Sequence, residues 1–208
     1  MRRAFGTAAI VLVSMATCGC GSRVMVPPRI DLKPHEVIGV IEFNSSSDDA
    51  LGPFATERFI GAARRDQGMV RFVKLGTETE VLEAVSRDRL DPAAFKALGE
   101  KYGVKTVITG DLVFSDVRPN IAVRHSLTSI GVSADVHATL AVQMVETASG
   151  ASLWSRSADA TQRIGAAHFS TNKDVSLQVD DPENAYNRLV DGLVHAVTPE
   201  FRVTWERR

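Results

Sequence analysis

The chain has 208 residues, with 24 lysines and arginines against 25 aspartates and glutamates, 44% apolar residues and a formal charge of −1. This length suits one domain with or without a tail, and the ordinary apolar content argues against an intrinsically disordered chain, a collagen-like chain and a polytopic membrane protein. Nothing favours a nucleic-acid partner, because the basic residues form no stripe and are matched by as many acids.

The amino end predicts an export signal over residues 1–19. Arg2 and Arg3 are followed by an apolar stretch over 4–16. A positive start of this kind stays on the cytoplasmic side while the apolar stretch enters the export machinery. About 13 residues are too few to span the roughly 30 Å hydrocarbon core of a bilayer, which takes about 20. We therefore expect this segment to be removed.

Two cysteines lie at the end of this signal. The segment Thr17-Cys18-Gly19-Cys20 resembles the bacterial lipobox, in which a cysteine thiol is acylated, with palmitate for example, and the preceding peptide is cleaved. Cys20 is the predicted attachment residue because Gly19 precedes it, and Cys18 is the alternative. A disulfide would close a very small strained ring, and no further cysteine is present for a metal site. By resemblance to enterobacterial sorting, Gly21 after Cys20 favours the outer membrane, on its periplasmic side.

Residues 20–34 are predicted to form the lipid anchor and an extended tether. Pro27, Pro28 and Pro34 lie there among few apolar residues, and such composition favours an extended connection. The remaining residues, 35–208, are predicted to form a single α/β periplasmic domain.

The first half of this domain alternates strands and helices. Short β-branched runs predict strands, and apolar residues at helical spacing predict helices. Thr77 and Glu80 have capping-box spacing, and Asp91 is a predicted cap. The predicted elements are a strand over 37–43, a helix over 51–65, a strand over 70–75, a helix over 77–85, a helix over 91–102 and a strand over 104–114 that is interrupted at Gly110.

A long alternation dominates the second half. Apolar residues occupy every second position over 132–144, which predicts a strand well beyond the typical five or six residues. A turn over 147–150 and a return strand over 152–164 complete a predicted antiparallel hairpin. A final helix is expected from Pro182, and a terminal strand over 201–205 is expected to pair back onto the sheet.

These elements predict an α/β (α+β) fold, a mixed β-sheet with flanking helices and a long antiparallel β-hairpin. Segments 37–44, 98–112 and 142–154 resemble the opening strand, the helix-glycine-strand segment and the hairpin turn of a group of envelope lipoproteins. That group includes the curli secretion channel subunit, the penicillin-binding-protein activator lipoproteins and the amino-terminal domain of the Tol translocation protein. The resemblance implies the fold and the compartment, and it singles out no activity.

Candidate catalytic and metal-binding residues are few. No pair of histidines has the i,i+4 spacing with glutamate of a zinc hydrolase helix, and no glycine-rich phosphate loop occurs. Ser170 and Lys173 fit Ser-x-x-Lys, but the companion motifs are missing. The acidic pairs at 48–49 and 180–181 are interpreted as solvated turn and cap carboxylates. We predict no catalytic residue, no metal and no cofactor besides the covalent lipid on Cys20.

Two segments between the predicted elements are candidates for a partner surface. They are the long connection over 115–131 and the polar stretch over 165–181, since long loops in compact domains are often functional. The candidate contact residues are Pro119, Ile121, Val123, Leu127, Ile130 and Phe169. The alternative is that both segments are variable excursions with no partner.

The sequence thus predicts a lipid-anchored, non-enzymatic accessory module for another envelope protein, as a single copy or a homo-oligomer. The alternative is a subunit of an oligomeric curli-type secretion pore, whose hairpins would build a barrel from several copies. Against the pore, Arg156 and Gln162 are expected on the same face as Trp154, and aromatic girdles are missing. A strand that faces the protein core explains the alternation with fewer assumptions. An enzyme is the third hypothesis, and no set of catalytic residues supports it.

Overall fold

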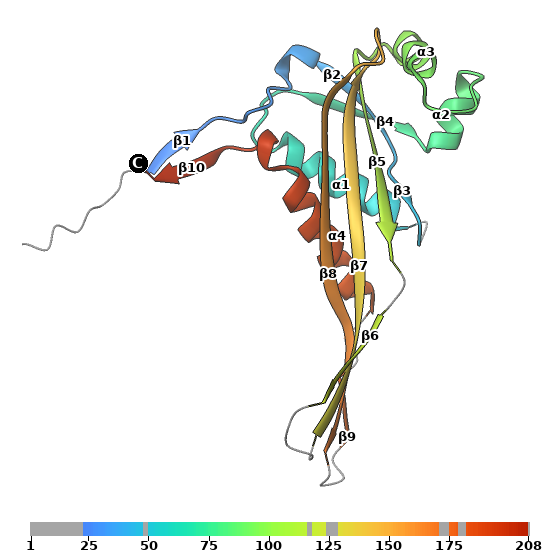
Figure 1. The fold of residues 1–208 in the computed structure, drawn as a ribbon. Helices are drawn as coiled ribbons and strands as arrows, with labels where there is room; N and C mark the ends of the chain where they lie inside the picture. The colour runs from blue at the N-terminus through green and yellow to red at the C-terminus, as the bar shows by residue number, and fades with distance from the viewer. Residues whose placement is uncertain are drawn as a thin grey trace, which may run out of the picture.

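The computed structural model describes residues 23–47, 50–115, 118–123, 129–170, 175–178 and 182–207. They form one mixed sheet with helices on both faces and a separate two-stranded ribbon (Figure 1). The helices are η1 (Lys33–His35), α1 (Leu51–Arg64), α2 (Glu78–Ala84), α3 (Pro92–Tyr102), α4 (Pro182–Val197) and η2 (Pro199–Phe201). The strands are β1 (Arg23–Val26), β2 (Val37–Ile41), β3 (Asn44–Ser45), β4 (Arg71–Gly76), β5 (Thr106–Phe114), β6 (Arg118–Val123), β7 (Ser129–Glu146), β8 (Ser152–Ser170), β9 (Val175–Gln178) and β10 (Thr204–Arg207).

The main sheet has the strand order β4-β2-β5-β7-β8-β9, with β3 also paired to β5 and β6 also paired to β7. Strand β2 is parallel to both β4 and β5, because helical crossovers connect these strands. From β5 onward the pairing along the sheet order is antiparallel. The predicted mixed sheet with a long antiparallel hairpin is therefore confirmed.

Each face of the sheet has its own hydrophobic core. Helices α1 and α4 cover one face, where Phe59 and Leu193 are fully buried with strand residues such as Leu140. Helices α2 and α3 cover the other face, where Leu98 packs with Val107. The even-numbered residues of β7 from Val136 to Met144 face the first core and are at most 3% exposed.

Local sequence signals set the ends of α2 and α3 as predicted. Thr77 and Glu80 form a complete capping box at the start of α2. The carboxylate of Asp91 accepts a hydrogen bond from the Ala94 amide at 2.7 Å, which caps α3. Gly103 follows α3 with a φ of 65°, the left-handed conformation that glycine adopts without strain.

Gly110 does not interrupt β5, contrary to the prediction. The strand runs without a break from Thr106 to Phe114. A Cβ at position 110 would lie 3.1 Å from the Phe43 ring and 3.1 Å from the Ala141 carbonyl oxygen. The glycine therefore serves close packing under an aromatic ring, which is the other reason for a glycine inside a strand.

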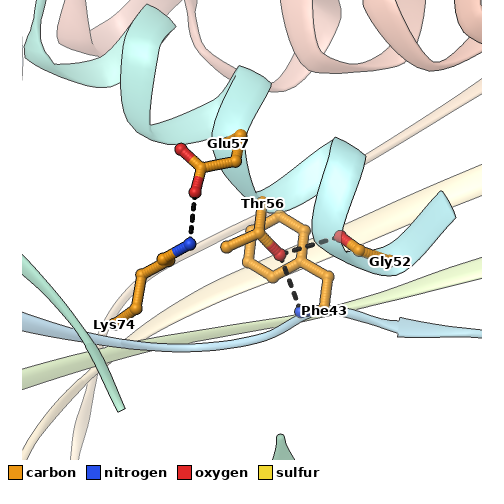
Figure 2. A network of polar contacts seen from close by, with 5 residues as sticks. All are labelled: Phe43, Gly52, Thr56, Glu57 and Lys74. Carbon is orange, nitrogen blue, oxygen red and sulfur yellow. Dashed lines mark hydrogen bonds and ion pairs between the residues drawn. The ribbon is translucent and has the colours of Figure 1, made fainter. Parts of the chain in front are cut away.

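A buried threonine fixes α1 to the end of β2. The Phe43 amide donates a hydrogen bond to Thr56 Oγ1 at 2.9 Å, and the Thr56 hydroxyl donates to the Gly52 carbonyl at 2.8 Å (Figure 2). At the next position of the helix, Glu57 is exposed and pairs with Lys74 on β4. The buried pair holds the helix against the sheet, since an unpaired amide at Phe43 would be costly.

The segment predicted as a tether is in part structured. Leu32 is fully buried in the core beneath α1 and α4, and Ile30 packs against that core. The side chain of Gln67 joins both, because it accepts from the Leu32 amide at 2.8 Å and donates to the Ile30 carbonyl at 2.8 Å. The folded body in the structure therefore starts before residue 35.

The terminal strand does not pair with the main sheet, contrary to the prediction. Strand β10 pairs with β1 in antiparallel fashion, from Arg23 opposite Arg207 to Val26 opposite Thr204. The two strands form a ribbon that leaves the body of the molecule (Figure 1).

Candidate partner-binding surface

The two segments predicted as connections form strands. Strand β6 lies within the first segment and pairs with β7, and β9 lies within the second and pairs with β8. We call the resulting four-stranded region the distal sheet: residues 118–123, 129–135, 163–170 and 175–178. In Figure 1 it extends past the lower ends of helices α1 and α4. The predicted loops were therefore wrong in conformation.

Backbone register brings the candidate contact residues together. Val123 is paired with Ile130, which is in turn paired with Phe169. Ile121 is paired with Val132, two residues along β7, and Pro119 is paired with Ala134. Positions two apart on a strand share one face, so Pro119, Ile121, Val123, Ile130 and Phe169 all belong to one face of the distal sheet. Leu127 lies outside the described residues.

The two faces of the distal sheet differ sharply in composition. The first face, which we call the apolar face, is formed by Pro119, Ile121, Val123, Ile130, Val132, Ala134, Gly165, Ala167, Phe169, Val175 and Leu177. The opposite face is mostly polar or charged and its apolar residues are small; it is formed by Arg118, Asn120, Ala122, Ser129, Gly131, Ser133, Asp135, Arg163, Ala166, His168, Ser170, Ser176 and Gln178. The apolar face lies on the same side of β7 as core residues Val136 and Ala138. It thus continues the core side of the sheet beyond the helices.

A bulge in β8 makes this alignment. The register shifts between Ala134 and Asp135, where Gly165 and Arg163 are their respective partners, so Ile164 has no partner on β7. Before the bulge, the even-numbered residues of β7 pair with even-numbered residues of β8, such as Val136 with Gln162. After the bulge, the even-numbered residues of β7 pair with odd-numbered residues of β8. The bulge therefore places Phe169 in the same row as Ile130, an arrangement that a simple alternation cannot predict.

The described strand that is nearest in sequence to the predicted lipid attachment lies away from the distal sheet (Figure 1). Cys18 and Cys20 are outside the described residues, and the first described strand, β1, begins at Arg23. In Figure 1 this strand is far from the distal sheet and the ribbon points in a different direction. No described helix is long and apolar enough to cross a membrane.

Three histidine side chains, those of His35, His137 and His195, are engaged in ordinary hydrogen bonds. His35 Nδ1 lies 2.7 Å from Thr106 Oγ1, and His137 Nδ1 lies 3.1 Å from Thr161 Oγ1. His195 contacts the guanidinium of Arg202. Among the described residues no group of three or more histidine, cysteine or acidic side chains is placed to hold a metal ion.

A shallow groove of about 310 Å³ lies between α1 and α4. The Arg58–Asp191 ion pair crosses it at 3.2 Å, and Arg202 lines it. Burial lowers the pKa of Arg202, and the charge of Arg65 lowers it further while Asp66 opposes the shift. No serine, threonine, cysteine or lysine lines the groove, and no buried side-chain nitrogen or oxygen among the described residues lacks a hydrogen-bond partner, so the groove offers neither a nucleophile beside a base nor an unpaired buried group.

Comparisons with known proteins give likenesses in fold. No family model matches the chain, and no curated protein matches it. Among solved structures, the PelC dodecamer from Paraburkholderia phytofirmans has a TM-score of 0.41 at 11% identity, covering 86% of this chain and 96% of that one. Lipoprotein GNA1162 from Neisseria meningitidis has a TM-score of 0.38 at 13% identity, covering 77% and 96%.

The LpoB C-terminal domain from Escherichia coli is also similar, with a TM-score of 0.36 at 14% identity, covering 61% of this chain and 82% of that domain. Of these similar structures, GNA1162 is described as a lipoprotein. At these TM-scores the similar structures give no information on a binding partner or an assembly of this chain.

Proposed function

We propose that the chain is a non-enzymatic cell-envelope lipoprotein, acylated on Cys20 and facing the periplasm from the outer membrane, that binds another envelope protein through its distal sheet. The observation that carries the proposal is the register of the distal sheet, which gathers the apolar residues of four strands on one face. Where such an apolar face is exposed to solvent, it is typical of an interaction site.

The lipid anchor supports binding by the distal sheet because it keeps the domain at the membrane. Acylation with more than one chain holds a protein on a membrane far more firmly than one chain does. A domain held on the membrane meets a partner in the same membrane at a raised effective concentration. We therefore expect a moderate intrinsic affinity of the distal sheet to suffice for binding.

The anchor is tested by replacing Cys20 with alanine, alongside a Cys18→Ala variant. The proposal predicts that only the Cys20→Ala protein lacks the acyl mass and leaves the membrane fraction. A protein that stays membrane-bound and unacylated whichever cysteine is replaced would contradict it.

The surface is tested with two neighbouring substitutions on β6. Ile121→Glu places a charge on the apolar face, whereas Asn120→Glu adds the same charge to the opposite face. We expect the first to remove the crosslinked adducts that the wild-type protein forms in its native envelope, and the second to keep them. Equal urea midpoints for the two variants would exclude misfolding as the cause, and equal loss of adducts would contradict the assignment.

The second candidate function is the curli-type pore, with the hairpins of several copies in a barrel. Its supporting observation is the length of β7 and β8, 18 and 19 residues, beyond the about 9–11 residues that cross a bilayer as a strand. Against it, residues 136–144 of β7 bury their even-numbered side chains under α4. The mass of the purified complex in detergent distinguishes the two, because a pore requires a large ring of identical subunits.

A further inference from the structure

The ribbon of β1 and β10 lacks a core of its own. Seven of its residues are exposed and only Val26 is half-buried, as the burial patterns of the two four-residue strands show. In Figure 1 the ribbon projects from the body. A two-stranded ribbon with no packed face is at best marginally stable in water, so a surface that covers one face would stabilise it.

Register divides the ribbon into two unlike faces. Met25 is directly opposite Trp205. Two positions further along the ribbon, Arg23 is directly opposite Arg207. These four residues therefore share one face, which we call the Trp205 face. Trp205 is 63% exposed and Met25 is 56% exposed. The Trp205 face is therefore apolar near the body and cationic toward its end, and it has no acidic residue.

The other face of the ribbon is turned toward the body. Thr204 and Glu206, which share that face, line a groove of about 320 Å³ together with Arg29 and Arg156. The one acidic residue among the described ribbon residues, Glu206, therefore lines the same groove as arginines of the body. The Trp205 face points away from this groove.

The two arginines of the Trp205 face are like charges placed opposite each other, which favours binding of an anion. Like charges directly opposite on neighbouring strands are destabilising. Neither Arg23 nor Arg207 forms an ion pair with any residue that the structure describes. A negatively charged group outside the chain would relieve this repulsion.

The base of the ribbon is held firmly, so its direction is fixed relative to the body. Gln67, which is 2% exposed, donates to the Phe201 carbonyl at 2.7 Å. The Trp154 indole donates to the Glu200 carboxylate at 2.5 Å, and the Val203 amide donates to Asp66 at 2.9 Å. These contacts lie just before β10 in the chain and orient the strand as it leaves the core.

Chain length limits how far the ribbon can lie from the predicted anchor. Only Gly21 and Ser22 separate Cys20 from Arg23, the first residue of β1. At about 3.5 Å per residue, three steps span at most about 11 Å. The headgroup layer on each side of a bilayer is about 5–7 Å thick. An acylated Cys20 would therefore hold Arg23 at or within reach of the phospholipid headgroups.

We propose that the Trp205 face is a membrane-docking surface for anionic phospholipid, an inference that rests on the proposed acylation of Cys20. Trp205 and Met25 enter the interfacial region, where tryptophan is enriched. Arg23 and Arg207 bind headgroup phosphates, which satisfies both cations at once. Docking fixes the orientation of the body above the membrane, and thereby the direction in which the distal sheet points.

The test uses the mature acylated protein in vesicles of phosphatidylethanolamine and phosphatidylglycerol that contain brominated acyl chains. Trp154→Phe leaves Trp205 as the only tryptophan, and Trp205→Phe leaves Trp154, which is 9% exposed. We expect bromine to quench the fluorescence of Trp205 and not that of Trp154. If Trp154→Phe fails to fold, the difference between the wild-type protein and Trp205→Phe supplies the same signal.

The arginines are tested by Arg23→Gln with Arg207→Gln, against a matched pair of exposed arginines, Arg71→Gln with Arg87→Gln. Each arginine near an anionic surface is worth roughly a fivefold change in binding. We expect the first pair to lower the ratio of docked to undocked ribbon by about 25-fold, and the control pair to leave it unchanged. Equal effects of the two pairs would overturn the role of Arg23 and Arg207.

Three further outcomes distinguish a failure of the proposed function from a failure of the membrane-docking proposal. A mature protein with no acyl chain would overturn the proposed function and this inference together. An acylated protein whose Trp205 stays open to aqueous acrylamide and insensitive to bromine would overturn the docking face alone. Shielding from acrylamide without quenching by bromine would assign the Trp205 face to a protein contact instead of a membrane.

Discussion

The two halves of the β7–β8 hairpin have the same alternating pattern in β7 and different surroundings. In the half nearest the turn, the even-numbered residues of 136–144 are buried under helix α4. In the distal half the same side of β7 continues past the ends of the helices (Figure 1). A period of two therefore predicts a strand and its apolar side, whereas contacts with helices far away in sequence decide whether that side is part of the core.

The largest expected effect in this comparison comes from Leu140→Ala. Leu140 is fully buried between the sheet and α4, so the substitution removes buried methyl groups and leaves a cavity that costs about 2–5 kcal/mol. The matched variant in the distal sheet, Val132→Ala, should lose much less. Urea unfolding of both proteins in detergent measures the difference, and equal losses would show that the two halves are packed alike.

Thr56→Val, in helix α1, is expected to destabilise the protein less than Leu140→Ala. It removes the acceptor of the Phe43 amide and leaves that buried group unpaired, at a cost of about 1–3 kcal/mol. Thr161→Val is the control, because Thr161 is exposed on the hairpin and bonds only the His137 ring among the described contacts. A loss at Thr161 as large as that at Thr56 would contradict the importance of the α1 attachment.

The smallest expected effect is at the exposed ion pair of Lys74 and Glu57. The hydrogen bond from Lys74 to Glu57, together with the charge of the carboxylate, raises the pKa of Lys74 above 10.5. A raised pKa in the folded state stabilises the fold below pH 10.5, and this contribution is lost as the pH rises through the raised value. Glu57→Gln should therefore lower the unfolding midpoint slightly at pH 7 and leave it unchanged at strongly alkaline pH. A deficit that persists at alkaline pH would place its cause elsewhere.

Much of the body could be predicted because its signals are local. The capping box at Thr77, the cap at Asp91 and the alternation over 132–144 each depend on residues close in sequence. The mixed sheet followed from the order of these elements. The sequence resemblance to envelope lipoproteins agreed with the same architecture.

The missed features depend on residues far apart in sequence. Strand β6 is short and gains its conformation from pairing with β7, and the partner of β10 is β1, at the other end of the chain. The bulge at Ile164 reverses which residues of β8 share a face. The sequence around Gly110 predicts an interruption of the strand, because the packing of the Phe43 ring against this position depends on a residue far away in sequence. The register places five of the candidate surface residues on one face, and their role in binding a partner stays a prediction.

We expect the distal sheet to face a protein partner and not the lipid. A direct measurement places a fluorophore at Val132→Cys, on the apolar face, or at Ser133→Cys, on the opposite face, of the acylated protein in vesicles with brominated lipids. We expect bromine to quench neither label. Quenching at position 132 but not at 133 would mean that the apolar face lies in the bilayer, as in a pore, and would contradict the proposed function.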